Sequence, residues 1–383
     1  MARSLYIHWP FCLAKCPYCD FNSHVRDSVD HAVWEAALLA DMRHEAGLAS
    51  GEPLDSIFFG GGTPSLMPPA LVAWLLAEAE RLWSFAPGIE ITLEGNPSSV
   101  EAANYADLAA AGVNRASLGL QALDDQTLHF LGRLHNAAEG LKAVETAQAV
   151  FGRVSIDLIY ARPGQTIADW QAELAQAIAL GTSHMSLYQL TIEPGTRFET
   201  LVRKGDFIPL DDDACADLFT LTREQTAAAG LPAYEISNHA RPGEESRHNL
   251  TYWRYQDYVG IGPGAHGRRG GEATVRHKKP ENWLAAVGAT GHGIMETRPL
   301  GLREQAAEAM LMGLRLREGI DLSAKARRFA LAEADLLNPA KVALFEEQGL
   351  VWRNGELLGV TEAGMPLLDA LLGELVPAEL VEA

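Results

Sequence analysis

Short apolar runs alternate with longer amphipathic stretches along the first two-thirds of the chain. The apolar runs cover residues 4–8, 54–59, 89–94, 115–120, 154–160 and 184–190. The amphipathic stretches cover residues 30–46, 69–83, 99–111, 136–151, 167–180 and 212–229. This alternation predicts βα units and a parallel sheet. The nearly unbroken Val, Ile, Leu and Phe content of the runs indicates strands that are covered on both faces.

Glycines mark the ends of several predicted helices. Gly47, Gly112, Gly181 and Gly230 each follow an amphipathic stretch, so we expect helices that end in a left-handed residue. About six βα units can form either a partial barrel or an open, doubly wound sheet. The pattern of apolar positions does not separate these two architectures.

The remaining third of the chain has a different character. Residues 236–300 are rich in Gly, His, Arg and aromatic side chains, and this region is expected to be looser and to cover the preceding domain, residues 1–235. Residues 301–383 are mostly helical but contain a β-like segment that turns at Asn354-Gly355, a hairpin signal. The order of a helix, a hairpin and a second helix predicts a small winged-helix-like module. From Asp321 onward it holds 5 Lys/Arg against 11 Asp/Glu, so DNA reading by its wing is not expected.

Charge and composition narrow the class of protein. The 383 residues carry a formal net charge of −19, which argues against sequence-independent nucleic-acid binding and against a polybasic membrane contact. No apolar run reaches the length of a membrane span, and His8 and Pro10 interrupt any signal-peptide-like region near the N-terminus. We therefore expect a cytoplasmic protein in a reducing compartment, where clustered cysteines are metal ligands rather than disulfides.

Three cysteines lie within eight residues, directly after the first predicted strand. Cys12, Cys16 and Cys19 form the pattern C-x3-C-x2-C. Structural zinc usually takes four ligands in two separated pairs, and no second pair exists, although a distant His could complete a zinc site. Three thiolates can instead hold three irons of a cubane [4Fe–4S] cluster, which normally takes four. The fourth iron would then be open to a chelating ligand.

Polar residues and glycines follow the other predicted strands. A triple glycine precedes Thr63 after the second strand and is expected to expose backbone N–H and C=O groups to a ligand. The polar residues at or beyond later strand ends are Glu94, Gln121, Arg133 and Asp157. Because the carboxyl ends of parallel strands meet at one edge, we expect these side chains to converge. A protein carboxylate such as Glu94 can accept hydrogen bonds from a ribose diol of a ligand, and an arginine such as Arg133 can pair with a ligand carboxylate.

Taken together, these motifs resemble the radical SAM superfamily. The cysteine motif, residues 6–12, Gly-Gly-Gly-Thr-Pro at 60–64, Glu-Gly-Asn-Pro at 94–97, Gly-Leu-Gln at 119–121 and Asp-Leu-Ile-Tyr at 157–160 carry the resemblance. The resemblance extends over essentially the whole chain. Within the superfamily, the chain most resembles the HemN/HemW branch, which contains oxygen-independent coproporphyrinogen oxidases and haem chaperones.

The resemblance implies an α/β fold, a partial (β/α)6 TIM-like barrel with a small C-terminal α+β winged-helix-like domain. It also implies a [4Fe–4S] cluster on the three cysteines, with S-adenosylmethionine (SAM) chelating the free iron. By position in the motifs, the SAM site would be lined by Tyr6, Tyr18, Gly61, Gly62, Thr63, Glu94, Gln121, Arg133 and Asp157. Arg162 departs from the usual pattern after the fifth strand, and would either alter a ligand contact or point to solvent.

Two features favour the haem chaperones over the oxidases within this branch. Phe21 stands where the decarboxylating oxidases have a further cysteine, and only eleven residues precede Cys12. Residues 248–252 match the H-N-x-x-Y motif associated with haem, so His248 and Tyr252 are predicted to bind haem, with His248 as an axial ligand. Arg247 and Arg254 are predicted to pair with the haem propionates, and Tyr252, Trp253, Tyr255 and Tyr258 to stack on the macrocycle.

The resemblance implies a haem carrier that serves respiratory haem proteins, with an electron donor such as flavodoxin or ferredoxin. Two alternatives remain open. One is a radical SAM enzyme that acts on a tetrapyrrole, and the other is a binding protein whose cluster is structural.

Overall fold

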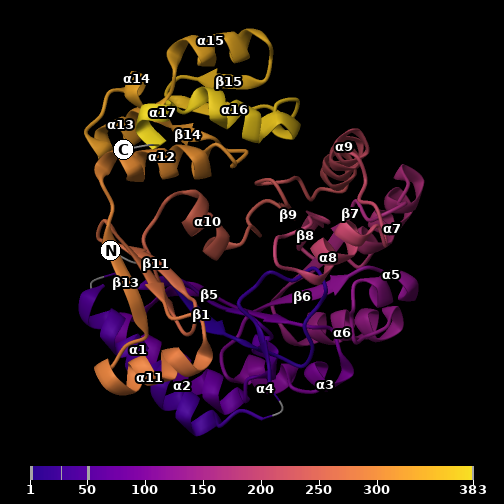
Figure 1. The fold of residues 1–383 in the computed structure, drawn as a ribbon, viewed down its shortest axis with the longest axis vertical. Coiled ribbons are helices and arrows are strands. Elements are labelled where there is room, and N and C mark those ends of the chain that lie inside the picture. Colours follow the sequence, from indigo (N-terminus) through magenta and orange to yellow (C-terminus); the bar gives the residue numbers. More distant parts are fainter. Residues whose placement is uncertain (1–2, 27, 50–51, 382–383) are drawn as a thin grey trace.

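The computed structural model describes residues 3–26, 28–49 and 52–381. Its centre is a curved sheet with six adjacent parallel strands in the order β1, β4, β5, β6, β7, β8 (Figure 1). Their bounds are β1 Ser4–Trp9, β4 Leu54–Gly61, β5 Phe85–Gly95, β6 Arg115–Gln121, β7 Arg153–Tyr160 and β8 His184–Gln189. All six apolar runs are therefore strands, and their parallel pairing confirms the βα prediction.

Helices cover the outer face of this sheet, as the amphipathic stretches predict (Figure 1). The long ones are α1 His31–Leu48, α2 Pro69–Trp83, α6 Ala137–Val150, α7 Ile167–Ala179 and α9 Asp212–Ala228. The side chains of Asp30, Asn136, Thr166 and Asp211 accept hydrogen bonds from the first turns of α1, α6, α7 and α9, which satisfies otherwise unpaired N–H groups. Shorter helices are α3 Ser99–Ala102, α4 Tyr105–Ala110, α5 Asp125–Phe130 and α8 Arg197–Lys204.

Two of the expected helix features differ in the structure. The stretch 99–111 is not one helix, because α3 ends at Ala102 and α4 begins at Tyr105. Gly47 does not end α1, which continues to Leu48 and is capped by Ala49 at φ −129°. Gly112, Gly181 and Gly230 do take positive φ values of 116°, 76° and 77°, so the prediction holds at these three positions.

The segment that was expected to be loose is regular and extends the sheet. Strand β9 Asn238–Ala240 pairs antiparallel with β8, and β10 Tyr258–Ile261 pairs parallel with β1 on the opposite side. Strands β11 His266–Arg269, β12 Glu272–Arg276 and β13 Ile294–Pro299 continue outward from β10 in antiparallel order. Helices α10 Arg247–Trp253 and α11 Pro280–Thr290 lie in the same segment. The sheet thus has eleven strands with β13 and β9 at its edges, and no described pairing joins those edges.

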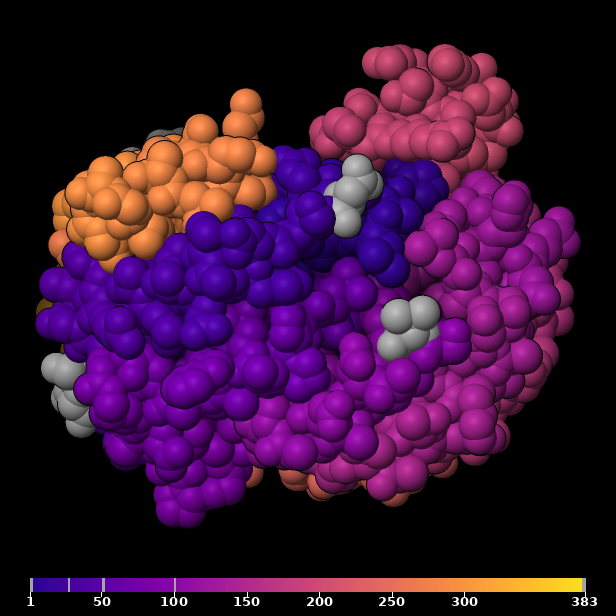
Figure 2. Space-filling model, turned by 90° about the horizontal axis from the view of Figure 1, so that it is seen from below, coloured from indigo at the N-terminus to yellow at the C-terminus, as the bar shows by residue number. Residues whose placement is uncertain are grey.

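A buried ion-pair network fixes this segment to α1. The carboxylate of Asp41 accepts hydrogen bonds from Arg276 Nε (2.7 Å) and from the backbone N–H groups of Gly262 and Gly293. Glu45 accepts from Arg276 Nη2 (2.8 Å) and from Arg269 Nε (2.7 Å). Residues near 280–300 consequently lie against the first fifty residues on the surface in Figure 2.

The C-terminal module has its own hydrophobic core and stands at one end of the molecule (Figure 1). It contains α12 Leu302–Gly313, α13 Leu322–Phe329, α14 Glu333–Leu336, α15 Pro339–Glu347, α16 Leu368–Leu375, α17 Ala378–Val381 and the strands β14 Ile320–Asp321, β15 Val351–Asn354 and β16 Leu357–Val360. Gly355 (φ 62°) forms the turn between β15 and β16, which confirms the hairpin. The architecture is the expected α/β fold with an α+β C-terminal module. None of the helices in the described residues has the length and apolar character needed to cross a bilayer.

Candidate functional site

The three cysteines lie on the loop between β1 and α1, which contains the two-residue strands β2 Phe11–Cys12 and β3 His24–Val25. All three are unpaired thiols and line one cavity of about 360 Å³. Thr63 Oγ1 donates to Cys12 Sγ (3.4 Å), and Ser23 Oγ lies 3.9 Å from Cys19 Sγ. Burial raises the pKa of Cys12 and of Cys19, so both thiolates need a nearby positive charge such as an iron cluster.

Ligands of a cubane cluster are spaced differently from ligands of a single ion. No group of three His, Cys, Asp or Glu side chains in the described ranges is placed to hold one metal ion. In a cubane, each thiolate binds a different iron, so the sulfur atoms surround a larger object. Three cysteines that share a cavity wall without meeting at one point fit such a cluster.

Arg133 connects the cysteine loop to the strand ends. Its Nη1 donates to Cys16 Sγ (3.2 Å) and to Tyr18 Oη (3.2 Å). Its Nη2 donates to the carbonyl of Gly119 (3.0 Å) and to Asn96 Oδ1. Its Nε is buried, and none of the described residues gives it a hydrogen-bond partner. The guanidinium therefore ties the Cys16 sulfur to the end of β6 and to Asn96.

Within the triple glycine, the expectation of N–H groups exposed to a ligand is wrong for Gly61 and Gly62. The N–H groups of Gly61, Gly62 and Thr63 donate to Glu94 Oε2, Trp9 O and Phe11 O, so they are not open to a ligand. A Cβ on Gly62 would lie 2.6 Å from Phe11 O, and one on Gly61 would lie 2.5 Å from the His8 ring. Glycine is thus required because the end of β4 packs directly on His8 of β1 and on the start of the cysteine loop.

Two carboxyl groups face the cavity, Glu94 from β5 and Asp157 from β7, with β6 between these strands. Burial, followed by the charge of Asp157, raises the pKa of Glu94 to about 8, and burial raises the pKa of Asp157 to about 6. Ser117 Oγ donates to Asp157 Oδ1 (3.3 Å). Such carboxyl groups gain hydrogen-bond donors when a polyhydroxylated ligand enters, and a ribose diol supplies two hydroxyl groups.

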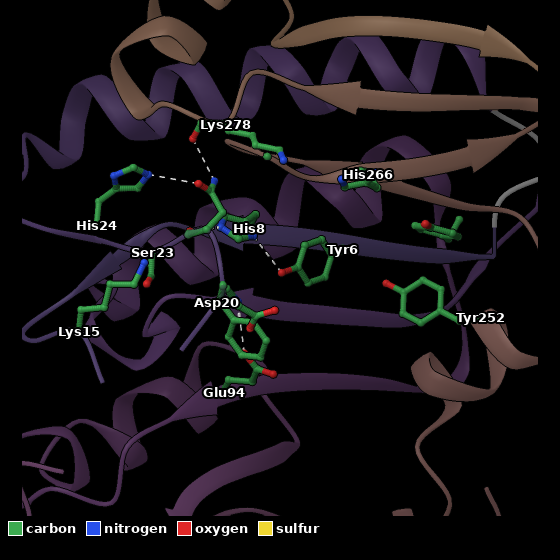
Figure 3. A pocket seen from close by; sticks show the side chains of 15 residues that line it. Tyr6, His8, Lys15, Asp20, Ser23, His24, Glu94, Tyr252, His266 and Lys278 are labelled. Atoms are coloured by element: carbon green, nitrogen blue, oxygen red, sulfur yellow. Dashed lines mark hydrogen bonds between the residues drawn. The ribbon is translucent and has the colours of Figure 1, made fainter. Parts of the chain in front are cut away.

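Most of the predicted SAM-site residues are brought together. The cavity that holds the cysteines is also lined by Tyr18, Gly61, Gly62, Thr63, Glu94, Gln121, Arg133 and Asp157. Gln121 reaches it from an irregular end of β6, where the pairing with β7 shifts and its φ is 69°. Tyr6 lines a second, adjoining cavity instead, where its hydroxyl lies 3.0 Å from His8 Nδ1 (Figure 3).

Asn96 is a site residue that sequence reasoning missed. Its Oδ1 accepts from Arg133, and its Nδ2 donates to Thr63 Oγ1 (3.2 Å), so it joins two predicted residues. The signal was present, because Asn96 lies just beyond β5 within the quoted Glu-Gly-Asn-Pro motif. Arg162, in contrast, takes neither expected position. It pairs with Glu173 of α7 in a buried ion pair and lines neither cavity described above.

The predicted haem residues are separated by the structure. Tyr252 lines the second cavity, whereas His248 is 1% exposed behind it. His248 Nε2 lies 2.6 Å from Tyr252 Oη, and its Nδ1 lies 3.1 Å from Ser56 Oγ. Burial lowers the pKa of His248 to about 3, so its ring is neutral. Axial ligation by His248 would require Nε2 to exchange the tyrosine hydroxyl for iron.

The neighbours of His248 have other partners as well. Arg247 donates to Gly88 O (2.7 Å), and Arg254 forms a double hydrogen bond with Glu318 (2.8 and 2.9 Å). Tyr255 is buried in the core of the C-terminal module, and Tyr258 lines the second cavity. Both arginines therefore already have partners in the protein, and neither lines the second cavity.

Comparison with known proteins assigns the family. The radical SAM superfamily model matches residues 6–177, and the HemN C-terminal domain model matches residues 300–367. The "Heme chaperone HemW" of Haemophilus influenzae is 38% identical over 96% of this chain and 96% of its own length. This chain belongs to the radical SAM superfamily, in its HemN/HemW branch.

Other relatives agree with this assignment. The mitochondrial "Radical S-adenosyl methionine domain-containing protein 1" of Bos taurus is 38% identical over 97% of this chain and 87% of its own length. The structure of coproporphyrinogen III oxidase (HemN) from Escherichia coli superimposes with a TM-score of 0.81 over 97% of this chain and 89% of that chain. At 22% identity, this second likeness shows the shared fold. Membership of the superfamily implies a [4Fe–4S] cluster and SAM, and the thiols, Arg133 and the two carboxyl groups fit both.

Proposed function

We propose that this chain is a haem carrier that binds a [4Fe–4S] cluster, SAM and haem, and passes haem to respiratory haem proteins. The observation that carries the proposal is the 38% identity with the haem chaperone of Haemophilus influenzae over almost the full length of both chains. Phe21 supports it further, because this position, expected to be a cysteine in decarboxylating oxidases, has no thiol.

In this proposal, the cysteine cavity holds the cluster and SAM. Cys12, Cys16 and Cys19 would ligate three irons, while the Arg133 side chain and the Glu94 carboxyl would contact SAM. A cluster of this kind transfers single electrons and offers its open iron to SAM. The protein's own part is to orient both groups and to limit the access of water.

A reduced cluster needs an electron donor, which we propose to be a small protein such as a flavodoxin or ferredoxin. Leu13 (56% exposed) and Leu134 (69% exposed) lie on the rim of the cysteine cavity. Exposed apolar patches can mark contact sites for a protein partner, and we place the donor over these two leucines. Exchange of both leucines for serine should slow cluster reduction by the donor and leave reduction by dithionite unchanged.

The test of the carrier function uses anaerobically reconstituted protein. About four irons per chain are expected for one cubane cluster. Haem added to this protein should bind in a fixed ratio and move to a haem-free respiratory protein, while coproporphyrinogen III stays unconverted in the presence of SAM and a reductant. Mass spectrometry of deoxyadenosine and porphyrins is the readout. Protoporphyrinogen IX formed over many turnovers would instead establish the alternative, a radical SAM enzyme that acts on a tetrapyrrole.

A further inference from the structure

A second cavity of about 610 Å³ adjoins the cysteine cavity. The two share a wall formed by Lys15, Phe21, Ser23, Gly61 and Glu94. Its other walls come from β1, the cysteine loop and the segment that contains α10 and β11 (Figure 3). Its volume is within the range of about 300–1,000 Å³ that is usual for small-molecule sites.

The walls of the second cavity combine aromatic surface with positive charge. Phe21 is 60% exposed, and Tyr6, Tyr252 and Tyr258 line the same space. The cationic side chains are Lys15 and Lys278, and the carboxyl groups of Asp20 and Glu94 belong to the same lining. Aromatic faces pack against flat apolar rings, and ammonium groups pair with carboxylates. The cavity therefore suits a flat apolar molecule that carries carboxylates at its edge.

Three histidines face this cavity, and they differ in what their rings contact. Both ring nitrogens of His8 take part in hydrogen bonds: Nδ1 lies 3.0 Å from Tyr6 Oη, and Nε2 lies 2.9 Å from Asn22 O. His24 Nε2 lies 3.2 Å from Asn22 Oδ1. For the His266 ring, no hydrogen bond occurs within the described part of the chain, and its side chain is exposed. Partial burial, then the charge of Lys278, lowers the pKa of His266, which keeps the imidazole neutral and able to bind iron.

The position of His266 in the fold also favours a ligand role. It begins β11, directly after the glycine-rich turn that contains Gly262 (φ 92°) and Gly264 (φ 76°). A Cβ on Gly264 would lie 2.5 Å from Asn22 Nδ2, so glycine there lets this turn pack on the cysteine loop. His266 and Tyr252 lie at one end of the cavity, and Lys15 and His24 at the other (Figure 3). His248 lies outside, behind Tyr252.

We propose that haem binds in this second cavity with the His266 imidazole as an axial ligand of the iron and with Lys15 and Lys278 paired with the propionates. This assignment rests on the haem-carrier function proposed above. It places haem beside the cluster and SAM and makes His248 a positioning residue, which holds the Tyr252 hydroxyl at the cavity wall.

The test is a titration of haem into wild-type protein and histidine variants, followed by Soret absorbance and EPR of the ferric complex. His266→Ala should lower haem affinity about tenfold or more and remove the imidazole signature, and added imidazole should restore it. His266→Tyr should replace that signature with one of a tyrosinate-ligated ferric haem. His129→Ala, on the exposed side of α5, is the matched control and should behave as wild type. Iron and sulfide content is measured in parallel for every variant.

The propionate contacts have their own pair of variants. Lys278→Ala should weaken haem binding without moving the Soret band, and the loss should shrink at high salt. Lys279→Ala, one residue along and outside the cavity lining, should have no effect.

The possible outcomes separate this assignment from the carrier function. Wild-type protein that binds no haem would overturn both. Normal haem binding with the same axial-ligand signature in wild type, His266→Ala and His266→Tyr would overturn only the His266 assignment. Loss of that signature in His248→Ala alone, with cluster content intact, would return the ligand to His248.

Discussion

The two cavities share a wall, but they are assembled from very different parts of the chain. The cysteine cavity is lined by residues between Cys12 and Asp157, which come from the cysteine loop, from consecutive parallel strands and from the segments that follow those strands. Besides Gly61 and Glu94, the second cavity combines residues 6–24 with residues 252–278. The first is local in topology, since each βα unit adds one strand end beside the last. The second exists only because β10 returns to pair with β1.

This difference decides how each cavity depends on the rest of the protein. In the cysteine cavity, side chains from the cysteine loop and the strand ends bond one another directly, as Arg133 does with Cys16 and Asn96. The second cavity depends on the buried network of Asp41, Glu45 and Arg276, which lies outside both cavities. A change in that network should affect the second cavity more than the first.

The largest expected effect is the loss of the cluster from the cysteine cavity while the second cavity still binds haem. Cys16→Ala removes one of three thiolates, so reconstituted protein should lose its iron–sulfur absorbance almost completely. Haem binding should persist, because His266 and Lys278 are untouched. Cys215→Ala, the same substitution outside the cysteine loop, is the control for general damage. A full cluster in Cys16→Ala would refute the assignment of the cluster.

A second substitution tests the support of the second cavity. Asp41 is fully buried, and Asp41→Ala leaves Arg276 Nε and the backbone N–H groups of Gly262 and Gly293 without their acceptor, although Arg276 Nη2 keeps Glu45. Breaking a buried pair in this way costs about 3–5 kcal/mol, which a urea denaturation curve can measure. Asp107→Ala on the exposed face of α4 is the control. A loss below about 1 kcal/mol would show that the network is not needed.

A third substitution affects the cysteine cavity alone. Glu94→Ala should weaken SAM binding by about 1.5–3 kcal/mol, because hydrogen bonds between a carboxylate and the ribose would be lost. The EPR spectrum of the reduced cluster, titrated with SAM, reports the affinity, and the iron content should not change. An EPR spectrum that saturating SAM leaves unchanged in the wild type would favour a structural cluster.

The smallest expected effect is a pH dependence of folding stability, measured on protein that holds neither cluster nor SAM. The pKa of Glu94 is raised to about 8 from its ordinary 4.5, so its contribution to folding stability is fully present below pH 4.5 and is lost as pH rises toward 8. Glu94→Gln cannot ionise and should become more stable than wild type across this range, by at most about 1.4 kcal/mol per pH unit. Glu80→Gln, exposed on α2, should follow the wild type. Parallel curves for wild type and Glu94→Gln would contradict the raised pKa.

The sequence by itself determined the six parallel strands, their covering helices and most of the cysteine cavity. The reason is that apolar periodicity reports which strands are buried, and parallel strands bring their carboxyl ends to one edge. Glu94, Gln121 and Asp157 could therefore be grouped without coordinates. The hairpin at Asn354-Gly355 was readable for a similar reason, because its turn is encoded by adjacent residues.

Only the tertiary structure decided which histidine reaches the second cavity. The sequence motif at 248–252 and the glycine-rich turn before His266 look equally suited to a ligand. The backbone of α10 turns His248 inward onto Ser56, whereas β11 leaves His266 exposed at the cavity. The glycines were expected to indicate loose backbone, yet they allow β10 and β11 to pack on the cysteine loop. Contacts between residues about 240 positions apart leave no local periodicity, so their outcome depends on how the whole sheet is assembled.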